Sequence, residues 1–193
     1  MLEENKTLEE RMTPEERELY ESFKSKIGQE FVPEPSHEMF FPLLNEEPVT
    51  WSRIKKWAKV NEDPNPLWFD EEYAKNSRWG GIVAPPLFLM TIDAGTTPAA
   101  YFVDKLYTPA PNAVLKLEKY RTFRGAMQTD SQWEFFEPVR PGDKIFPKAT
   151  CTDIFWKQGK RFRLLFTSGV TTYTNQKGQL LACCRTGAVY MFK

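Results

Sequence analysis

The sequence predicts an α+β domain in which an antiparallel sheet wraps around a central apolar helix, with an amphipathic N-terminal helix in front of it. Residues 112–192 consist of long β-branched and aromatic segments with turn signals and no helical break between them, which favours antiparallel strands. Residues 87–94 are apolar almost all round, so a helix there must be enclosed on nearly every side. A chain of 193 residues suits one domain. We assign residues 1–30 to an N-terminal helical extension and residues 31–193 to that domain.

The N-terminal helix carries the signals of a capping box. Thr13 suits the N-cap, Pro14 the first helical position and Glu16 the reciprocal cap, while Gly28 supplies a stop. Apolar residues four positions apart form a narrow stripe that predicts packing on the outside of the domain: Leu19, Phe23 and Ile27.

A second helix is expected from a cap at Thr50 to the loop at 61–66, where Pro64 and Pro66 prevent it from continuing. Four apolar residues fall on one side of this helix: Trp51, Ile54, Trp57 and Val60. Residues 70–77 predict a further short helical turn.

The central apolar helix is expected to follow a break in the backbone. Gly80 and Gly81 end the preceding regular structure. Pro85 and Pro86 then open the helix, and Gly95 ends it. The turn signals PGD, QGK and QKG then separate most of the expected strands, which cover residues 112–123, 132–139, 144–156, 161–175 and 180–192.

Composition excludes several classes of function. Lys plus Arg and Asp plus Glu both number 26, so nucleic acid is not an expected partner. Three cysteines, two of them adjacent, suit neither a disulfide framework nor a metal site, and a reducing cytoplasm fits best. No stretch has the length and apolarity of a membrane span, so we expect no membrane partner.

Three motifs resemble the MaoC-like (R)-specific enoyl-CoA hydratase and dehydratase family, in its FAS1-like N-terminal-half branch. These are DPNPLWFDEEYA at 63–74, GGIVAPPLF at 80–88 and EPVRPGDKI at 137–145. The resemblance covers roughly residues 30–193 and implies the hot-dog fold, an acyl-CoA thioester as substrate and no cofactor. It also implies a role in lipid metabolism, such as fatty acid or steroid side-chain degradation.

The resemblance also shows which catalytic groups are missing. The family pattern is Asp-x-Asn-Pro-x-His, so Asp63 and Asn65 match and Trp68 stands at the histidine position. An indole N–H is only a donor, so Trp68 cannot shuttle a proton. The family's oxyanion donor at the head of the central helix falls on Pro85 and Pro86, and proline has no N–H.

Other residues are candidates for holding the substrate. Gly80 and Gly81 would give a pantetheine arm close access to the backbone, and three arginines are candidates for the CoA phosphates: Arg78, Arg121 and Arg124. The only histidine, His37, lies outside any motif spacing. Cys183 and Cys184 should point to opposite faces of a strand.

Structural roles compete with these functional ones. Asp63 and Asn65 beside prolines are typical of turn and helix-capping residues. Trp68 suits either ordinary core packing or one wall of an acyl tunnel, and each candidate arginine also suits a solvated surface.

The expected function is the non-catalytic half of a 2-enoyl-CoA hydratase or 3-hydroxyacyl-CoA dehydratase, in which a second hot-dog subunit supplies the Asp/His pair. The alternatives are a self-sufficient homodimeric hydratase using Asp63 and a non-enzymatic acyl-CoA-binding protein. Thioesterase activity is less favoured, because residues 82–88 offer no carboxylate and Asp93 lies near the far end of the helix. Either way the exposed edge of a single sheet favours a dimer or a heteromer.

Overall fold

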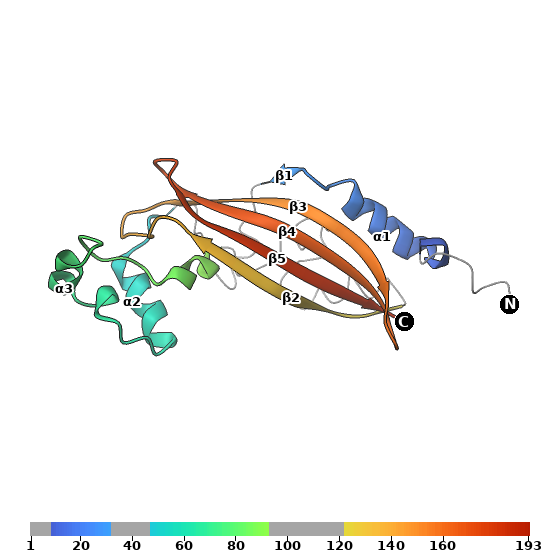
Figure 1. Cartoon of the computed structure of the whole chain (residues 1–193), viewed down its shortest axis with the longest axis horizontal. Helices are drawn as coiled ribbons and strands as arrows, with labels where there is room; N and C mark the ends of the chain where they lie inside the picture. Colours follow the sequence, from blue (N-terminus) through green and yellow to red (C-terminus); the bar gives the residue numbers. More distant parts are fainter. Residues whose placement is uncertain (1–8, 32–46, 93–121) are drawn as a thin grey trace.

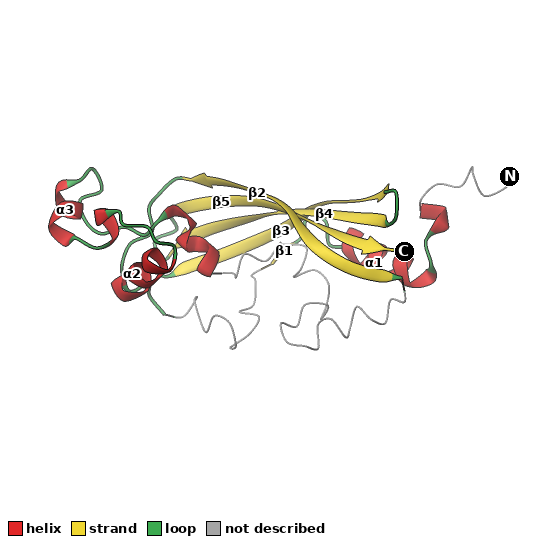
Figure 2. Ribbon diagram, turned by 90° about the horizontal axis from the view of Figure 1, so that it is seen from below, coloured by secondary structure: helices red, strands yellow, loops and turns green. Residues whose placement is uncertain are grey.

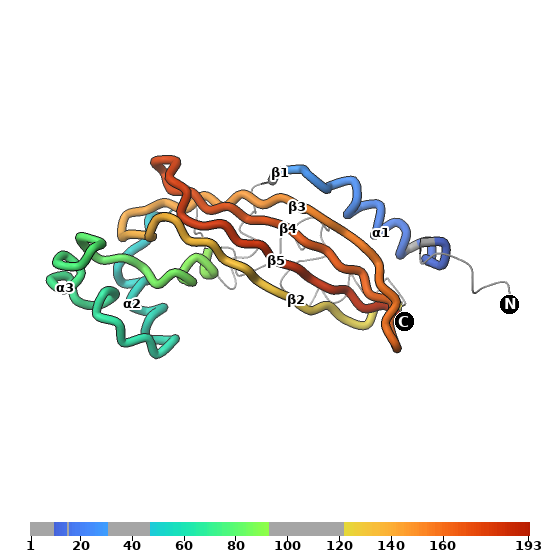
Figure 3. The backbone as a smooth tube through the Cα atoms, in the orientation of Figure 1, coloured from blue at the N-terminus to red at the C-terminus, as the bar shows by residue number. Residues whose placement is uncertain are grey.

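The computed structural model describes residues 9–31, 47–92 and 122–193, and Figure 1 draws the rest as a grey trace. Helices α2 and α3 lie at one end of a long sheet, and α1 lies at the other end with the C-terminus (Figures 1 and 3). The arrangement confirms the expected α+β class. Within the described ranges no helix is long and apolar enough to cross a membrane.

The strands that the structure describes pair antiparallel with one another, as predicted. Its strand order is β1-β3-β4-β5-β2. The strands are β1 (Glu30–Phe31), β2 (Phe123–Phe135), β3 (Ile145–Gln158), β4 (Arg163–Asn175) and β5 (Leu180–Phe192). The turns QGK and QKG connect β3 to β4 and β4 to β5, as expected.

The expected strand at 132–139 is only partly correct. β2 begins earlier, at Phe123, and ends at Phe135 because the chain then leaves the sheet toward the turn at 140–143. The expected strand at 112–123 lies almost wholly outside the described residues.

One face of the sheet carries two separate apolar clusters. The first gathers α2, the loop after it and the segment at 82–92 against β3, β4 and β5. The second packs α1 on the far end of the same strands, through Leu19, Tyr20 and Phe23. Strict alternation along β4, with every second residue buried from Leu165 to Asn175, makes this face the inner one.

Helix α1 (Pro14–Lys24) has the predicted capping box, in which Thr13 and Glu16 bond each other reciprocally. Its predicted end at Gly28 is wrong, because Ser25 is the C-cap. The Gly28 N–H donates instead to the Cys151 carbonyl on β3, at 2.9 Å. Leu19 and Phe23 are buried as the stripe predicts.

Ile27 departs from the stripe, since it lies beyond the helix and is 39% exposed. The end of the helix is therefore set by pairing with the sheet and not by the glycine alone.

Helices α2 (Trp51–Val60) and α3 (Glu71–Asn76) confirm the two middle predictions. Thr50 caps α2 through its hydroxyl, and Asp70 caps α3 by accepting from the Tyr73 N–H. Ile54 and Ala58 form the buried face of α2, whereas the predicted face residue Val60 is 73% exposed in the last turn.

The apolar segment after Pro85 differs from the prediction. Its described part is a 3-10 helix, η3 (Pro86–Thr91), which buries Phe88 and Leu89 against the sheet. Pro86 is exposed and Leu87 is 46% exposed, so enclosure is one-sided. Eclipsed side chains at every third position in a 3-10 helix give one buried stripe and not an all-round one. The predicted end at Gly95 lies outside the described residues.

The three cysteines are free thiols. Cys183 and Cys184 lie on opposite faces of β5 as predicted, since Cys184 is buried and Cys183 is half-buried. Burial raises the pKa of the Cys151 and Cys183 thiols, which leaves them less reactive.

A buried ion pair attaches α1 to the sheet, and its removal should destabilise the fold. Glu16 is fully buried and accepts from Arg163 Nη2 at 2.6 Å and from the Thr122 hydroxyl at 3.0 Å. Arg163→Ala leaves this carboxylate uncompensated, so we expect a loss of about 3–5 kcal/mol in the free energy of unfolding, measured by urea denaturation.

The matched control is Lys148→Ala, which removes the exposed ion pair between Lys148 and Glu30. An exposed pair contributes less than about 1 kcal/mol. Equal losses for the two variants would contradict the special role of Glu16.

Candidate functional site

The loop after α2 is built by a Schellman motif. Asn61 is the C-cap, and Glu62 takes the left-handed conformation with φ 53°. The Glu62 N–H donates to the Lys59 carbonyl and the Asp63 N–H to the Ala58 carbonyl, which is the hydrogen-bond pattern of this motif. The backbone of Asp63 is therefore fixed by the end of the helix.

The side chains of the loop bond along the loop itself. Asp63 Oδ1 accepts from the Asn65 N–H at 3.1 Å, and Asn65 Oδ1 accepts from the Leu67 N–H at 3.1 Å. Asn65 thereby caps the short 3-10 helix η2 (Pro66–Trp68), with Pro66 at its first position. These are the turn-building roles that compete with catalysis at Asp63 and Asn65.

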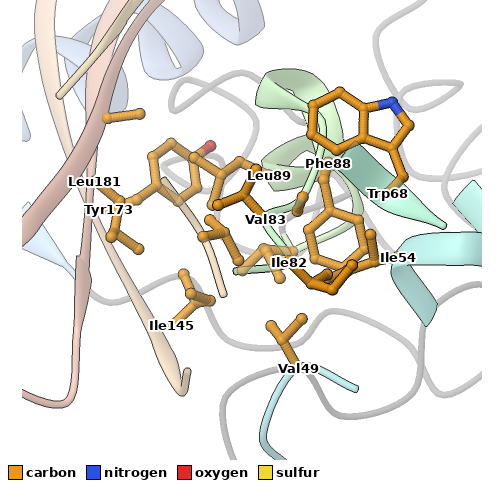
Figure 4. Packing of buried hydrophobic residues seen from close by; sticks show 14 of the residues in the cluster. Val49, Ile54, Trp68, Ile82, Val83, Phe88, Leu89, Ile145, Tyr173 and Leu181 are labelled. Carbon is orange, nitrogen blue, oxygen red and sulfur yellow. The ribbon is translucent and has the colours of Figure 1, made fainter. Parts of the chain in front are cut away.

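Trp68 faces Asp63. Its indole Nε1 donates to Asp63 Oδ2 at 2.8 Å, while its own carbonyl accepts from the Trp51 indole at 2.8 Å. The ring is 6% exposed and belongs to the same buried cluster as Phe88 and Ile54 (Figure 4). The structure therefore places Trp68 in the core and also against the candidate carboxylate.

This arrangement limits the chemistry of the loop. Each oxygen of the half-buried Asp63 carboxylate already accepts one protein N–H. The group opposite it is an indole, which has no lone pair with which to accept a proton. The loop can hold a polar group, but the side chain that bonds Asp63 Oδ2 is neither an acid nor a base.

The head of η3 is the second half of the candidate site. Pro85 is the N-cap residue without a side-chain cap, Pro86 is the first residue, and the Phe88 N–H already donates to the Pro85 carbonyl at 2.9 Å. The Arg53 guanidinium lies over the Phe88 ring, 5.9 Å from its centre. Burial lowers the pKa of Arg53, and the charge of Glu47 opposes that shift.

The Gly80–Gly81 break lies beside two arginines. The Arg78 guanidinium stacks over the Trp79 ring at 4.3 Å, and Arg140 Nη2 donates to the Trp79 carbonyl at 2.7 Å. Sequence reasoning selected Arg78 but missed Arg140. The sequence signal that could have identified Arg140 was its place in the third motif, EPVRPGD.

Arg124, a further candidate, does not join this site. Arg124 lies near the start of β2, which pairs with the C-terminal end of β5, at the end of the sheet remote from α3 (Figure 1). Arg121, His37 and Asp93 lie outside the described residues.

The antiparallel sheet, the apolar segment on its inner face and the Asp-containing loop beside it define a hot-dog protein of the dehydratase type. The family model described as "FAS1-like, dehydratase domain region" matches residues 44–183, well over half of the chain. The chain therefore belongs to the FAS1-like dehydratase family, which bears out the resemblance drawn from its three motifs.

Individual proteins also resemble this chain, at low sequence identity. The "Probable enoyl-CoA hydratase alpha subunit" of Thermomonospora curvata is 25% identical over 150 residues, which cover 75% of this chain and 45% of that protein. The chain therefore spans less than half the length of that relative.

Solved structures confirm the fold. A chain of the ChsH1–ChsH2 complex from Mycobacterium tuberculosis superposes with a TM-score of 0.63 and 18% identity, covering 90% of this chain and 95% of that one. The MaoC-like dehydratase from Rhodospirillum rubrum gives a TM-score of 0.53 and 21% identity, covering 76% and 87%. Both show the hot-dog fold that the sequence predicted.

The Trp68–Asp63 hydrogen bond should contribute to stability. Trp68→Phe keeps most of the ring but leaves Asp63 Oδ2 without its donor, so we expect a loss of about 1–3 kcal/mol in the free energy of unfolding. A double-mutant cycle with Asp63→Ala, measured by urea denaturation, should show a coupling above about 0.5 kcal/mol.

The control is Trp57→Phe. Trp57 packs against the same apolar cluster, and its indole N–H has no hydrogen bond to the described residues. Its substitution should show no coupling to Asp63, and strict additivity for Trp68 as well would contradict the assigned hydrogen bond.

Proposed function

We propose that this chain is the non-catalytic half of a 2-enoyl-CoA hydratase, a reaction that runs in reverse as 3-hydroxyacyl-CoA dehydration. A second hot-dog subunit supplies the Asp/His pair, and this chain forms the opposite wall of the acyl-CoA tunnel. The observation that carries the proposal is the Trp68 indole donating to Asp63 at the position where the family has histidine.

Hydration of a 2-enoyl thioester needs three groups. A base takes a proton from water as the oxygen bonds to C3, an acid delivers a proton to C2, and a donor stabilises the charge that develops on the thioester oxygen. In this chain Asp63 faces a donor-only indole, and Pro86 at the head of η3 has no N–H to offer.

The two departures from the family pattern, taken together, imply a large loss of catalytic rate. Loss of one oxyanion donor costs about 10²- to 10³-fold in rate, and loss of a positioned acid or base costs a further factor of roughly 10² to 10⁴. A site that lacks both is nearly idle, so a working hydratase needs catalytic groups from another chain.

The free edge of the sheet is where we place that other chain. The β3 edge is partly occupied by β1 at Ala149 and Thr150, whereas β2 is paired on one side only among the described residues. Exposed apolar side chains lie along β2 and just after it: Met127, Phe135 and Phe136. A long apolar strand edge is stabilised by pairing with a second sheet.

Similar proteins support an assembly of two subunits. The T. curvata relative is named an alpha subunit of a probable enoyl-CoA hydratase, and the M. tuberculosis structure is a complex of two named components. Both names fit a chain that works together with a second subunit.

The activity should belong to the assembly and not to this chain. We expect the purified single chain to hydrate crotonyl-CoA at least about 10³-fold more slowly than the complex that co-purifies from the native source. Formation of the 3-hydroxyacyl-CoA product, measured by mass spectrometry, gives this comparison.

Substitutions then assign the catalytic aspartate. Asp63→Asn should change the rate of the complex by less than about twofold, while Asp→Asn in the Asp-x-Asn-Pro-x-His motif of the mate should reduce it by about 10² or more. Ordinary turnover by the single chain, abolished by Asp63→Asn, would instead identify a self-sufficient homodimer. Thioester binding without turnover in any assembly would identify a non-enzymatic binding protein.

The assignment of the β2 edge has its own test. Met127→Lys places a charge on the 60% exposed Met127 position, and lysine on an edge strand opposes pairing. We expect at least about a tenfold loss of the co-purified mate, measured by size-exclusion chromatography. Phe146→Lys, on the 45% exposed Phe146 of β3, is the matched control and should retain the mate; the reverse result would move the interface to β3.

A further inference from the structure

The outer face of the sheet, opposite the two apolar clusters, carries a row of apolar side chains that crosses four strands. The strand register aligns Phe155 of β3 with Phe166 of β4, Phe166 with Val189 of β5, and Val189 with Met127 of β2. The rings of Phe155 and Phe166 stack with their centres 5.1 Å apart and their planes 9° from parallel. We call these four residues the outer row.

The outer row faces away from the two clusters. Ile154 and Leu165, which precede Phe155 and Phe166 in sequence, are buried in the cluster under α1, and successive side chains of a strand point to opposite faces. Phe155 is 44% and Met127 60% exposed, and the other two residues are half-buried. The described helices α1, α2, α3 and η3 pack on the inner face, so none of them covers the row.

The next row along the strands extends this apolar surface. Leu164 and Met191 pair with each other, two residues away from the outer row on β4 and β5, and both are half-buried. Met191 reaches over the edge strand, because a Cβ added at Gly125 would lie 3.2 Å from Met191 Cε. The solvent side of an antiparallel sheet is usually polar, so an apolar surface on this face is a candidate interface.

Two opposite charges flank the outer row on β3. Asp153 lies two residues before Phe155 and Lys157 two residues after it, so both lie on the outer face. Both side chains are exposed, and neither belongs to an ion pair among the residues that the structure describes. The charges are therefore placed symmetrically about the row.

A two-fold axis along the outer row makes this surface complementary to itself. Such an axis lays the row of a second copy on the row of the first, with Phe155 against Phe155, and exchanges the two sides of the row. Lys157 of each copy then faces Asp153 of the other. On β4 the larger Leu164 faces the smaller Ser168, because these two residues pair with Lys157 and Asp153. This is the arrangement of a closed, isologous dimer contact.

We propose that the outer row is the centre of a face-to-face interface between two copies of this chain. Stacked sheets lie about 10 Å apart, a gap that side chains from both sheets fill. The rows from Asp153 to Lys157 cover roughly 450 Å² of each copy, from the spacing of strands and residues. About 900 Å² in total is at the low end for specific contacts, so the association is reversible and depends on concentration.

This inference goes beyond the proposed function, because it uses the face of the sheet and not its β2 edge. Edge pairing with a second hot-dog subunit leaves the outer face of this chain available. The two contacts together predict an assembly of four subunits, in which two edge-paired dimers meet through the outer rows of this chain.

The main test is an exchange of charges, read by sedimentation equilibrium of the purified chain over a concentration series. Lys157→Asp and Asp153→Lys each bring like charges face to face, so each should raise the dissociation constant of self-association at least about tenfold. The variant with both substitutions restores the two ion pairs and should associate like the wild type. An equimolar mixture of the two single variants restores them between unlike copies, so it should associate as well.

Phe166→Lys tests the apolar centre of the interface. A charge there must lose its water when the sheets stack, so self-association should be lost. Thr172→Lys is the matched control, on the same face of the same strand but six residues away, and should associate like the wild type. If Phe166→Lys fails to fold, as measured by circular dichroism, the charge exchange decides alone. Met127 is not used, because it also lies on the β2 edge.

Three results would overturn the inference. The first is a wild-type mass that does not rise with concentration, including the case in which a different protein co-purifies through the outer row. The second is self-association that both single charge variants retain, which would place the contact elsewhere. The third is a loss that neither the double variant nor the mixture repairs, which would make the role of these residues structural.

The proposed function stands or falls separately. Phe166→Lys should retain the second hot-dog subunit and the hydratase activity of the native complex, because it leaves the β2 edge unchanged. Loss of that subunit together with self-association would show that the outer row belongs to the contact between unlike subunits, and would contradict the assignment to two copies of this chain.

Discussion

The hydrogen bond from the Trp68 indole to Asp63 determines how the whole candidate site is interpreted. Histidine in that place would share protons with the carboxylate, whereas an indole only donates to it. The same ring is buried against Phe88 of η3, so it joins the loop after α2 to the apolar segment on the sheet. One side chain thus bonds the candidate carboxylate and also packs among the elements around it.

The fold supplies a rigid support for this loop, because the elements around it share one apolar cluster with β3, β4 and β5. Figure 2 shows the helical segments gathered at one end of the twisted strands, with α1 at the other end. The second cluster under α1 is separate. The candidate site therefore belongs to the cluster at the α2 end of the inner face.

Local signals in the sequence predicted most of the described elements, because caps and turns act over a few residues. The capping box at Thr13, the cap at Thr50 and the alternation along β4 needed no long-range information. The end of α1 was mispredicted because Gly28 bonds Cys151, far away in sequence. The 3-10 geometry of η3 could not be predicted from the sequence either, because a run of apolar residues does not distinguish between helix types.

The candidate site shows the same division between local and long-range information. The motif exposed the missing histidine, but only the structure showed that the indole bonds the remaining carboxylate. Arg140 was missed because its hydrogen bond to Trp79 joins residues far apart in sequence and depends on the fold. Under the proposed function, a half-site without an acid–base pair still needs its binding groups, because a substrate held between two subunits must be held from both sides.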